Sequence, residues 1–297
     1  MSAVIAIVGP TASGKSAVAL RAATAFGGEI VSADSRQVYR GMDIGTAKPS
    51  PQEQARVRHH CIDLVDPGTR YDAARYQCDA LAALADLAAR GTRAYVVGGT
   101  GLYVRALLDG LRLGALPTDA GLRAALEARG AAGGGPLLHL ELARIDPVAA
   151  ARVDPRNVRR VVRYLEIATL AGAVPLERTN GVAARRLGLD PPRAHLDTQI
   201  LARVRRMVDE GVLAETETLL AQGLHPGLPS MSAHGYVHWA AHLRRELTLE
   251  DAVLATAKDV RAYARRQMTW FRRDPRIVWI DPLRDDPLAT LERLVAA

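Results

Sequence analysis

Gly9-Pro10-Thr11-Ala12-Ser13-Gly14-Lys15-Ser16 is the stretch of this 297-residue chain that decides its fold. The spacing matches the P-loop of nucleotide-binding proteins, whose backbone N–H groups surround phosphate oxygens. An apolar run, Val4–Val8, precedes the loop, and a helical pattern over residues 17–25 follows it. Glycines let the backbone approach an anion closely, and the dipole at the start of the helix favours negative charge. We therefore expect a polyphosphate here, with Lys15 on its oxygens and Ser16 on a Mg²⁺ ion that the phosphates also hold.

Two further apolar runs, residues 29–33 and 94–97, have the length and flanking turn signals of buried strands. Helical patterns lie between the three runs, and this alternation is typical of a doubly wound parallel sheet. Ligands of such sheets bind beyond the carboxyl ends of the strands. The chemistry is therefore expected in residues 9–16, 34–37 and 98–101.

The second half of the chain has a different pattern. Beyond about residue 115 the strand signal largely fades, and helical patterns are separated by glycine and proline, with four glycines in residues 130–136. We predict an α/β protein with a P-loop NTPase-like core and a parallel sheet, formed by residues 1–115 and 188–297. A small all-helical domain, residues 116–187, is expected to be inserted into this core.

Composition adds weaker constraints. The formal net charge of +7 favours an anionic partner such as nucleic acid, and the 48% hydrophobic share indicates a globular chain. No run approaches the roughly 20 apolar residues of a membrane span, and no signal peptide is recognisable, so a cytoplasmic location is expected. Two cysteines exclude a disulfide scaffold and a four-cysteine zinc site. Nothing indicates an obligate protein partner, and a monomer is expected.

The loop identifies a polyphosphate without specifying a reaction. P-loop enzymes that hydrolyse nucleotides usually carry a second apolar strand that ends in a metal-binding Asp. In this chain the run at residues 94–97 is followed by Gly-Gly-Thr100, and the only carboxylate at the end of a predicted strand is Asp34. This distribution of carboxylates argues against ATP hydrolysis. It favours the transfer of a group to a second substrate that faces Asp34.

The sequence Ser32-Ala-Asp34-Ser-Arg-Gln-Val-Tyr39-Arg-Gly-Met-Asp43-Ile-Gly-Thr-Ala-Lys48-Pro49 resembles the signature that follows the P-loop in the tRNA dimethylallyltransferases. Further segments resemble the same family in the same order, namely residues 58–63, 71–76, 98–103, 159–166 and 263–272. The matches run from about Val4 to Arg273, so they are far more specific than the P-loop alone.

The resemblance implies a reaction. Members of this family move a dimethylallyl group from dimethylallyl diphosphate to the N6 amine of the adenosine that is 3′-adjacent to the anticodon (position 37), in tRNAs reading codons that start with U. Diphosphate leaves, so the P-loop would hold the leaving group of a prenyl donor, with Mg²⁺ on its phosphates. The implied partner is the anticodon stem-loop of tRNA.

Three catalytic residues follow from the resemblance together with chemistry. Asp34 is the candidate general base for the weakly nucleophilic amine, or else a helix cap or a ligand of Mg²⁺ through water. Thr100 is expected to stabilise the departing diphosphate, or else to cap a helix. Alignment of residues 200–211 with the family places its catalytic arginine at Arg203. Arg205 and Arg206 are close by, so the register of the alignment stays open. The alternative is that these arginines form an ordinary solvent-exposed helix face without a catalytic role.

Several segments are expected to contact tRNA. One basic stripe recurs at helical spacing and consists of Arg156, Arg159, Arg160 and Arg163. By itself this pattern is typical of an ordinary solvent-exposed helix face. The family resemblance implies instead that the stripe contacts tRNA. The full set of expected tRNA contacts is Asp34, Ser35, Arg36, Gln37, Thr100, Arg123, Arg159, Arg160, Val161, Val162, Arg163, Met231, Ser232, Ala233, His234, Gly235, Tyr236, Arg265, Arg266, Gln267, Met268, Thr269, Trp270, Phe271 and Arg272.

Two other functions remain open at this stage. One is a small-molecule kinase, in which ATP occupies the P-loop and Asp34 activates a hydroxyl. The other is an RNA-binding module that retains a P-loop without catalysis. Incorporation of labelled dimethylallyl groups into unmodified tRNA separates both from a prenyltransferase.

Overall fold

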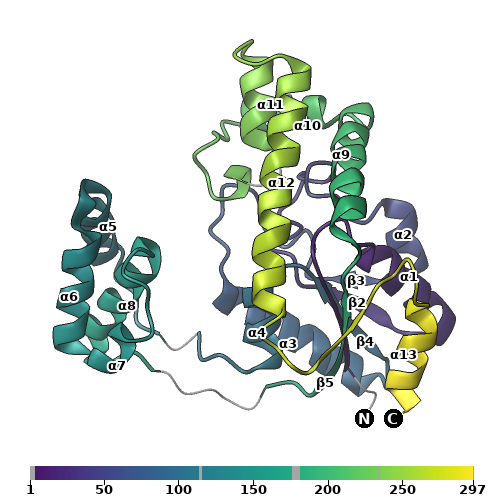
Figure 1. The fold of residues 1–297 in the computed structure, drawn as a ribbon, viewed down its shortest axis with the longest axis horizontal. Helices are drawn as coiled ribbons and strands as arrows, with labels where there is room; N and C mark the ends of the chain where they lie inside the picture. Colours follow the sequence, from purple (N-terminus) through teal and green to yellow (C-terminus); the bar gives the residue numbers. More distant parts are fainter. Residues whose placement is uncertain (1–3, 114–115, 176–180, 233–234, 297) are drawn as a thin grey trace. The chain divides into compact units, whose positions relative to one another are not determined.

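A computed structural model describes residues 4–113, 116–175, 181–232 and 235–296. The chain divides into two compact units, Met1–Asp109 together with Val182–Ala297, and Gly110–Gly181 (Figure 1). Each unit has its own buried apolar core. Within the described ranges no helix is both long enough and apolar enough to cross a membrane.

The first unit contains a six-stranded sheet in the order β3-β2-β4-β1-β5-β6, with every pair parallel. The strands are β1 (Val4–Val8), β2 (Glu29–Ser32), β3 (His59–His60), β4 (Ala94–Gly98), β5 (Ala184–Leu189) and β6 (Ile277–Ile280). Strands β1, β2 and β4 are the three that the apolar runs predicted, and they lie side by side in the middle of the sheet. The P-loop NTPase-like core with a parallel sheet is therefore confirmed.

Both faces of the sheet are covered, which explains why its strands are continuous apolar runs. Ile5 and Ile7 of β1 pack towards α1 (Lys15–Phe26) and α13 (Pro287–Ala296). The alternate residues, Ala6 and Val8, belong to the larger core on the other face. That core also includes apolar residues of α3 (Ala73–Ala89) and α4 (Gly101–Leu108).

The remaining helices of this unit bring residues from late in the chain to the site. They are α2 (Pro51–Arg56), α9 (Arg193–Asp209), α10 (Val212–Ala221), α11 (Tyr236–Leu243) and α12 (Leu249–Phe271). In Figure 1, α9 to α12 form one helical group next to the sheet. Two contacts locate this group at the carboxyl ends of the strands: Arg203 of α9 reaches Thr11 after β1, and Gln267 of α12 reaches Gly99 after β4.

The second unit is helical, with α5 (Ala120–Arg129), α6 (Gly135–Ile145), α7 (Pro147–Ala150) and α8 (Val158–Ala171). The glycine-rich stretch at residues 130–136, which separates two helical patterns in the sequence, joins α5 to α6 through a kinked helical turn. Gly133 has a φ of 86°, a left-handed conformation that glycine adopts without strain and that bends the chain between the two helices.

A buried carboxylate organises this helical unit. Glu166 of α8 is fully buried, and its oxygens accept hydrogen bonds from Arg123, from Arg163 and from the backbone N–H of Asp119. These donors hold the pKa of Glu166 below its usual range in spite of the opposing effect of burial. Arg123 and Arg163, both expected to contact tRNA, are therefore also structural partners of an interior charge.

The chain returns to the sheet earlier than the expected boundary at residue 188. β5 begins at Ala184 and pairs with β1. Its pattern Ala-Arg-Arg-Leu-Gly-Leu hides the strand because it contains two arginines. Arg186 is nevertheless buried, since it forms ion pairs with Asp109 and Asp274. These partners are distant in sequence, so local periodicity does not predict this strand.

Candidate active site

The P-loop has the conformation and the unmet polar groups of an anion site. Gly9 and Gly14 have φ values of 143° and 88°, and a Cβ at Gly9 would lie 2.5 Å from the carbonyl oxygen of Leu189. The hydroxyl of Ser13 is buried without a hydrogen-bond partner among the described residues. No acidic residue occupies the first turn of α1, and no side chain caps it. Its N-terminal N–H groups are therefore available to a phosphate.

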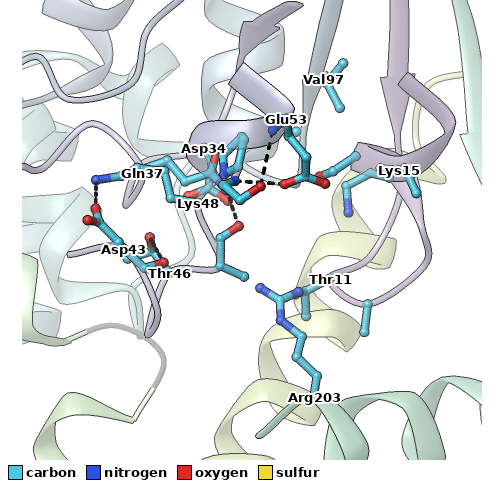
Figure 2. A pocket seen from close by; sticks show the side chains of 18 of the residues that line it. Thr11, Lys15, Asp34, Gln37, Asp43, Thr46, Lys48, Glu53, Val97 and Arg203 are labelled. Atoms are coloured by element: carbon cyan, nitrogen blue, oxygen red, sulfur yellow. Dashed lines mark hydrogen bonds and ion pairs between the residues drawn. The ribbon is translucent and has the colours of Figure 1, made fainter. Parts of the chain in front are cut away.

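A cavity of about 890 Å³ lies beside this loop. Figure 2 shows Lys15, Asp34 and Arg203 around the same space. They reach it from the P-loop, from the segment after β2, and from α9, so two segments near the start of the chain meet a helix from its second half. The expectation that residues at the carboxyl ends of β1, β2 and β4 share one site agrees with this lining, which also includes Gly98 and Gly99.

The amine of Lys15 is buried beside the P-loop. Its Nζ donates to the carbonyl oxygen of Pro10 at 2.5 Å. Burial lowers the pKa of Lys15 to about 7, the positive charge of Arg203 acts in the same direction, and the carboxylate of Asp34 opposes both. A bound diphosphate would supply the missing negative charge and restore the ammonium form.

Asp34 follows β2, and its side chain lines the cavity. Its Oδ1 accepts a hydrogen bond from the backbone N–H of Arg36 at 2.8 Å, which closes a short turn and does not cap a helix. The helix-cap alternative is therefore excluded. The charge of Asp34 acts on the pKa of both Lys15 and Arg203, so the carboxylate lies within electrostatic range of both cations.

Thr100 occupies the N-cap position of α4, but its side chain makes no capping hydrogen bond. Its Oγ1 instead accepts from the backbone N–H of Ser35 at 3.0 Å. Tyr263 lines the cavity, and burial raises the pKa of its hydroxyl. Thr100 thus joins the end of β4 to the segment after β2, beside Asp34.

The geometry separates the three neighbouring arginines of α9. Arg203 Nη1 donates to Thr11 Oγ1 at 3.1 Å, so its guanidinium lies against the P-loop. Arg205 is 58% exposed and pairs with Glu250. Arg206 lines the cavity and is exposed. Arg203 is therefore the arginine that contacts the loop, as the family alignment indicated. Burial lowers its pKa from the ordinary value, although a guanidinium remains charged at neutral pH.

Gln267 joins α12 to the backbone of the P-loop and of Gly99. Its Oε1 accepts from the backbone N–H of Thr11 at 2.8 Å, and its Nε2 donates to the carbonyl oxygen of Gly99 at 2.9 Å. A Cβ at Gly99 would lie 2.0 Å from this Nε2, which explains the glycine after β4. Gln267 was expected to contact tRNA, but its amide instead braces the P-loop against β4.

The residues expected at the tRNA divide by exposure. The exposed side chains are Arg159, Arg160, Ser232, Arg265, Arg266, Thr269, Trp270 and Arg272. Those of intermediate exposure are Asp34, Ser35, Arg36, Thr100, Arg123, Arg163 and Met268. The side chains buried in an apolar core are Val161, Val162, Met231, Tyr236 and Phe271. For these five the expected side-chain contact with tRNA is corrected, because packing leaves them no surface. Ala233 and His234 lie outside the described residues.

The two aromatic residues at the end of α12 have different environments. Phe271 belongs to the core, whereas Trp270 is 42% exposed, with the Arg105 guanidinium 5.6 Å from its ring. Of the two aromatic side chains, Trp270 is therefore the one that is available to stack on a nucleobase.

Some residues around the cavity were not expected from the motifs. Glu215 of α10 accepts hydrogen bonds from the backbone of residues 43–45, and Tyr263 lines the cavity. Glu215 is in an ordinary amphipathic helix, so nothing in its local sequence distinguishes it, whereas Tyr263 begins the segment at residues 263–272 that had been matched to the family without a role for this residue. Lys48 and Asp63, which pair beside the cavity, stand in segments that had been matched to the family but had been given no role.

Ser16 is the residue of this site whose chemistry fits a magnesium ion held mainly through phosphates. Within the described residues, no group of three or more His, Cys, Asp or Glu side chains is arranged to hold a metal. Ser16, at the start of α1, lines the cavity and is exposed. Mg²⁺ commonly takes one or two protein ligands and completes its shell with phosphate oxygens and water.

Comparisons with known proteins show the family of this chain. The family described as IPP transferase matches residues 37–274, and that described as isopentenyl transferase matches residues 2–66. The tRNA dimethylallyltransferase of Anaeromyxobacter dehalogenans (strain 2CP-C) is 50% identical over 95% of each chain. That of Thermomicrobium roseum is 47% identical over 94% of this chain and 86% of its own.

Solved structures show the same likeness. The tRNA isopentenylpyrophosphate transferase of Bacillus halodurans superposes with a TM-score of 0.74 at 38% identity, covering 100% of this chain and 96% of the other. A eukaryotic dimethylallyltransferase acting on tRNA gives a TM-score of 0.83 at 26% identity, with 99% and 78% coverage. The chain therefore belongs to the tRNA dimethylallyltransferase family.

Proposed function

We propose that this protein transfers the dimethylallyl group of dimethylallyl diphosphate to the N6 amine of the adenosine 3′-adjacent to the anticodon, in tRNAs that read codons starting with U. The observation that carries the proposal is the meeting of Lys15, Asp34 and Arg203 at one cavity beside the P-loop. The cations suit a diphosphate, and the carboxylate suits the amine that attacks next to it.

The proposed reaction is a substitution at C1 of the prenyl group. The N6 nitrogen forms a bond to C1, the bond between C1 and the diphosphate oxygen breaks, and diphosphate takes the electron pair. Asp34 accepts the proton that the amine loses. Lys15, Arg203 and the backbone N–H groups of the loop stabilise the charge on the leaving group. Thr100 is proposed to turn its hydroxyl to the same group from Ser35 Oγ, to which it donates at 3.4 Å in this structure.

Mg²⁺ is proposed as the metal cofactor, with Ser16 as its protein ligand. Bound to the diphosphate, it would neutralise part of the leaving group's charge.

Labelled dimethylallyl diphosphate tests the proposal directly. Purified protein, Mg²⁺ and unmodified tRNA should give label that remains in the tRNA, located at the adenosine next to the anticodon by nuclease digestion and mass spectrometry. A parallel reaction with labelled ATP and no prenyl donor tests the kinase alternative. Turnover of ATP without labelled tRNA would reject prenyl transfer.

The affinity for diphosphate should fall as the pH rises above about 7. The free protein holds Lys15 with a pKa of about 7, so its ammonium loses a proton above that pH, whereas bound diphosphate favours the charged form. The dissociation constant should therefore increase by up to about tenfold per pH unit until the pKa of the bound state is reached. Calorimetry in two buffers of different ionisation enthalpy measures the proton that is taken up.

Lys15→Arg is the matched control, because a guanidinium stays charged throughout this range. This variant should retain only the pH dependence of diphosphate itself. The same proton uptake in wild type and Lys15→Arg would show that Lys15 is not the group that titrates.

Arg159→Ala should weaken tRNA binding and make its salt dependence shallower by about one unit of slope, since one phosphate contact is lost. Arg159 is exposed and has no ion-pair partner within the described residues. Arg163→Ala should behave differently, because it removes a donor from the buried Glu166 and lowers the thermal stability of the helical unit. Filter binding over a range of salt concentrations, with melting curves, separates the two variants. An unchanged salt slope for Arg159→Ala would remove it from the interface.

A further inference from the structure

The carboxylate of Glu215 on α10 is surrounded by four hydrogen-bond donors. Its Oε2 accepts from the backbone N–H groups of Asp43 and Ile44 at 2.8 and 2.7 Å. Its Oε1 accepts from the N–H of Gly45 at 3.0 Å and from the hydroxyl of Tyr236 at 2.7 Å. Three successive N–H groups that converge in this way form an anion-binding concavity, and Glu215 fills it. Hydrogen bonds to a charged acceptor are stronger than those between neutral groups.

The surroundings hold this arrangement in a single geometry. Tyr236 is fully buried, and a Cβ at Gly45 would lie 2.5 Å from its ring, so the loop and the ring are in close contact. Burial and the charge of Glu215 both raise the pKa of the Tyr236 hydroxyl, which keeps it protonated as a donor. This role accounts for Tyr236 without a contact to tRNA.

The loop that Glu215 holds, residues 43–48, is a wall of the active-site cavity. Asp43, Ile44, Thr46, Ala47 and Lys48 all line the cavity. Displacement of this loop would therefore change the space available to the prenyl donor.

The same loop also sets the orientation of Gln37. The amide Nε2 of Gln37 donates to the carbonyl oxygen of Ala47 at 3.0 Å, and the hydroxyl of Ser32 donates to its Oε1 at 2.9 Å. These bonds fix the plane of the amide, and Gln37 lines the cavity together with Asp34. A shift of Ala47 would release one end of the amide.

The far end of the loop is held separately. Lys48, whose side chain is 3% exposed, donates to the carbonyl oxygen of Tyr39 at 2.8 Å and pairs with Asp43 and Asp63. These partners all lie within the first 63 residues. Glu215 is 170 residues or more away in sequence from the N–H groups it accepts, so it ties the loop to the helical group.

We propose that Glu215 is a positioning residue, which holds residues 43–48 as the wall of the donor cavity and, through Ala47, orients Gln37 beside Asp34. Glu215 acts through the loop and does not itself touch a substrate. The kinetic part of this inference rests on the proposed prenyl transfer, whereas its structural part does not.

Glu215→Gln, with Glu217→Gln as its matched control, tests the inference. Both residues are on α10, both substitutions remove one negative charge, and Glu217 is exposed. In Glu215→Gln an NH₂ group replaces one acceptor oxygen and faces the donors. Amide hydrogen exchange at residues 43–45 should become about tenfold faster or more, while exchange in β1 stays at the wild-type rate. Glu217→Gln should match wild type at both places.

Kinetics provide the second measurement. In Glu215→Gln the KM for dimethylallyl diphosphate should rise by about fivefold or more and kcat should fall, with tRNA affinity within about twofold of wild type. Unchanged exchange at residues 43–45 would overturn the proposal. Faster exchange throughout the protein would also overturn it, because it indicates a general loss of stability. Local loosening with an unchanged KM would show that the loop does not shape the donor cavity.

Tyr236→Phe serves as a milder variant, because it removes one of the four donors and keeps the ring against Gly45. It should change exchange and KM in the same direction as Glu215→Gln but by less, and no change in either would count against the arrangement. If wild-type protein fails to prenylate tRNA, the proposed function falls, and exchange at residues 43–45 still decides whether Glu215 holds the loop.

Discussion

Asp34→Asn is expected to lower the rate of prenyl transfer by about 10² to 10⁴-fold, the usual contribution of a general base. Asparagine keeps the Oδ1 that accepts from the Arg36 N–H, so the turn after β2 should persist. The lost property is the ability to take a proton from the attacking amine. Single-turnover rates with both substrates saturating, compared with tRNA affinity by filter binding, measure the effect on chemistry alone.

Two further measurements sharpen this test. Asp66→Asn, at an exposed carboxylate that pairs with Arg40, is the matched control and should keep the wild-type rate. A titration of Mg²⁺ separates the base from the alternative of a metal ligand through water. An Asp34→Asn enzyme restored by more Mg²⁺ would favour the ligand role, and a loss smaller than about tenfold would exclude the base.

Arg203→Ala should reduce kcat by about 10² to 10³-fold, because the departing diphosphate loses a preorganised charge. The guanidinium of Arg203 already lies against Thr11 in the P-loop, so it needs no rearrangement to meet the leaving group. Arg205→Ala, two residues away on the same helix and engaged with Glu250 at the surface, should change kcat by less than about twofold. Equal effects of the two substitutions would contradict the assignment.

Arg203→Ala has a second expected consequence. The charge of Arg203 lowers the pKa of Lys15, so its removal should raise that pKa above about 7. Diphosphate affinity in the variant would then begin to fall at a higher pH than in wild type. An unchanged pH dependence would indicate that the two cations do not interact across the site.

The motifs located the central strands and the segments that follow them. The apolar runs located β1, β2 and β4, and their carboxyl ends carry the P-loop, Asp34 and Thr100. This succeeded because a parallel strand buried on both faces is a continuous apolar run, and because a P-loop requires particular residues at fixed spacing.

The strands outside the central three were harder to predict. β5 carries Arg186, which is acceptable in the sheet only because Asp109 and Asp274 neutralise it. β3 has two residues, too few for a periodic signal. For both strands the stabilising partners are remote, and a local pattern carries no information about them.

Family segments predicted the regions that contact tRNA but did not distinguish exposed side chains from side chains that pack in a core. Tyr236, Val162 and Phe271 are in such segments, yet they fill cores. Gln267 and Glu215 brace the P-loop and the loop at residues 43–48. A segment that matches the family indicates that its residues contribute to the fold or to the site. Whether a given side chain faces the surface or a core depends on what packs against it.

The amino-acid sequence by itself determined the phosphate loop, the positions of the three central strands along the chain and the residues that can carry charge and accept protons, because these depend on residue type and short spacing. Only the tertiary structure decided which arginine of α9 meets the loop, which carboxylate holds residues 43–45, and how burial shifts the pKa of Lys15. Each of these depends on groups that are more than 150 residues apart in the chain and adjacent only after folding.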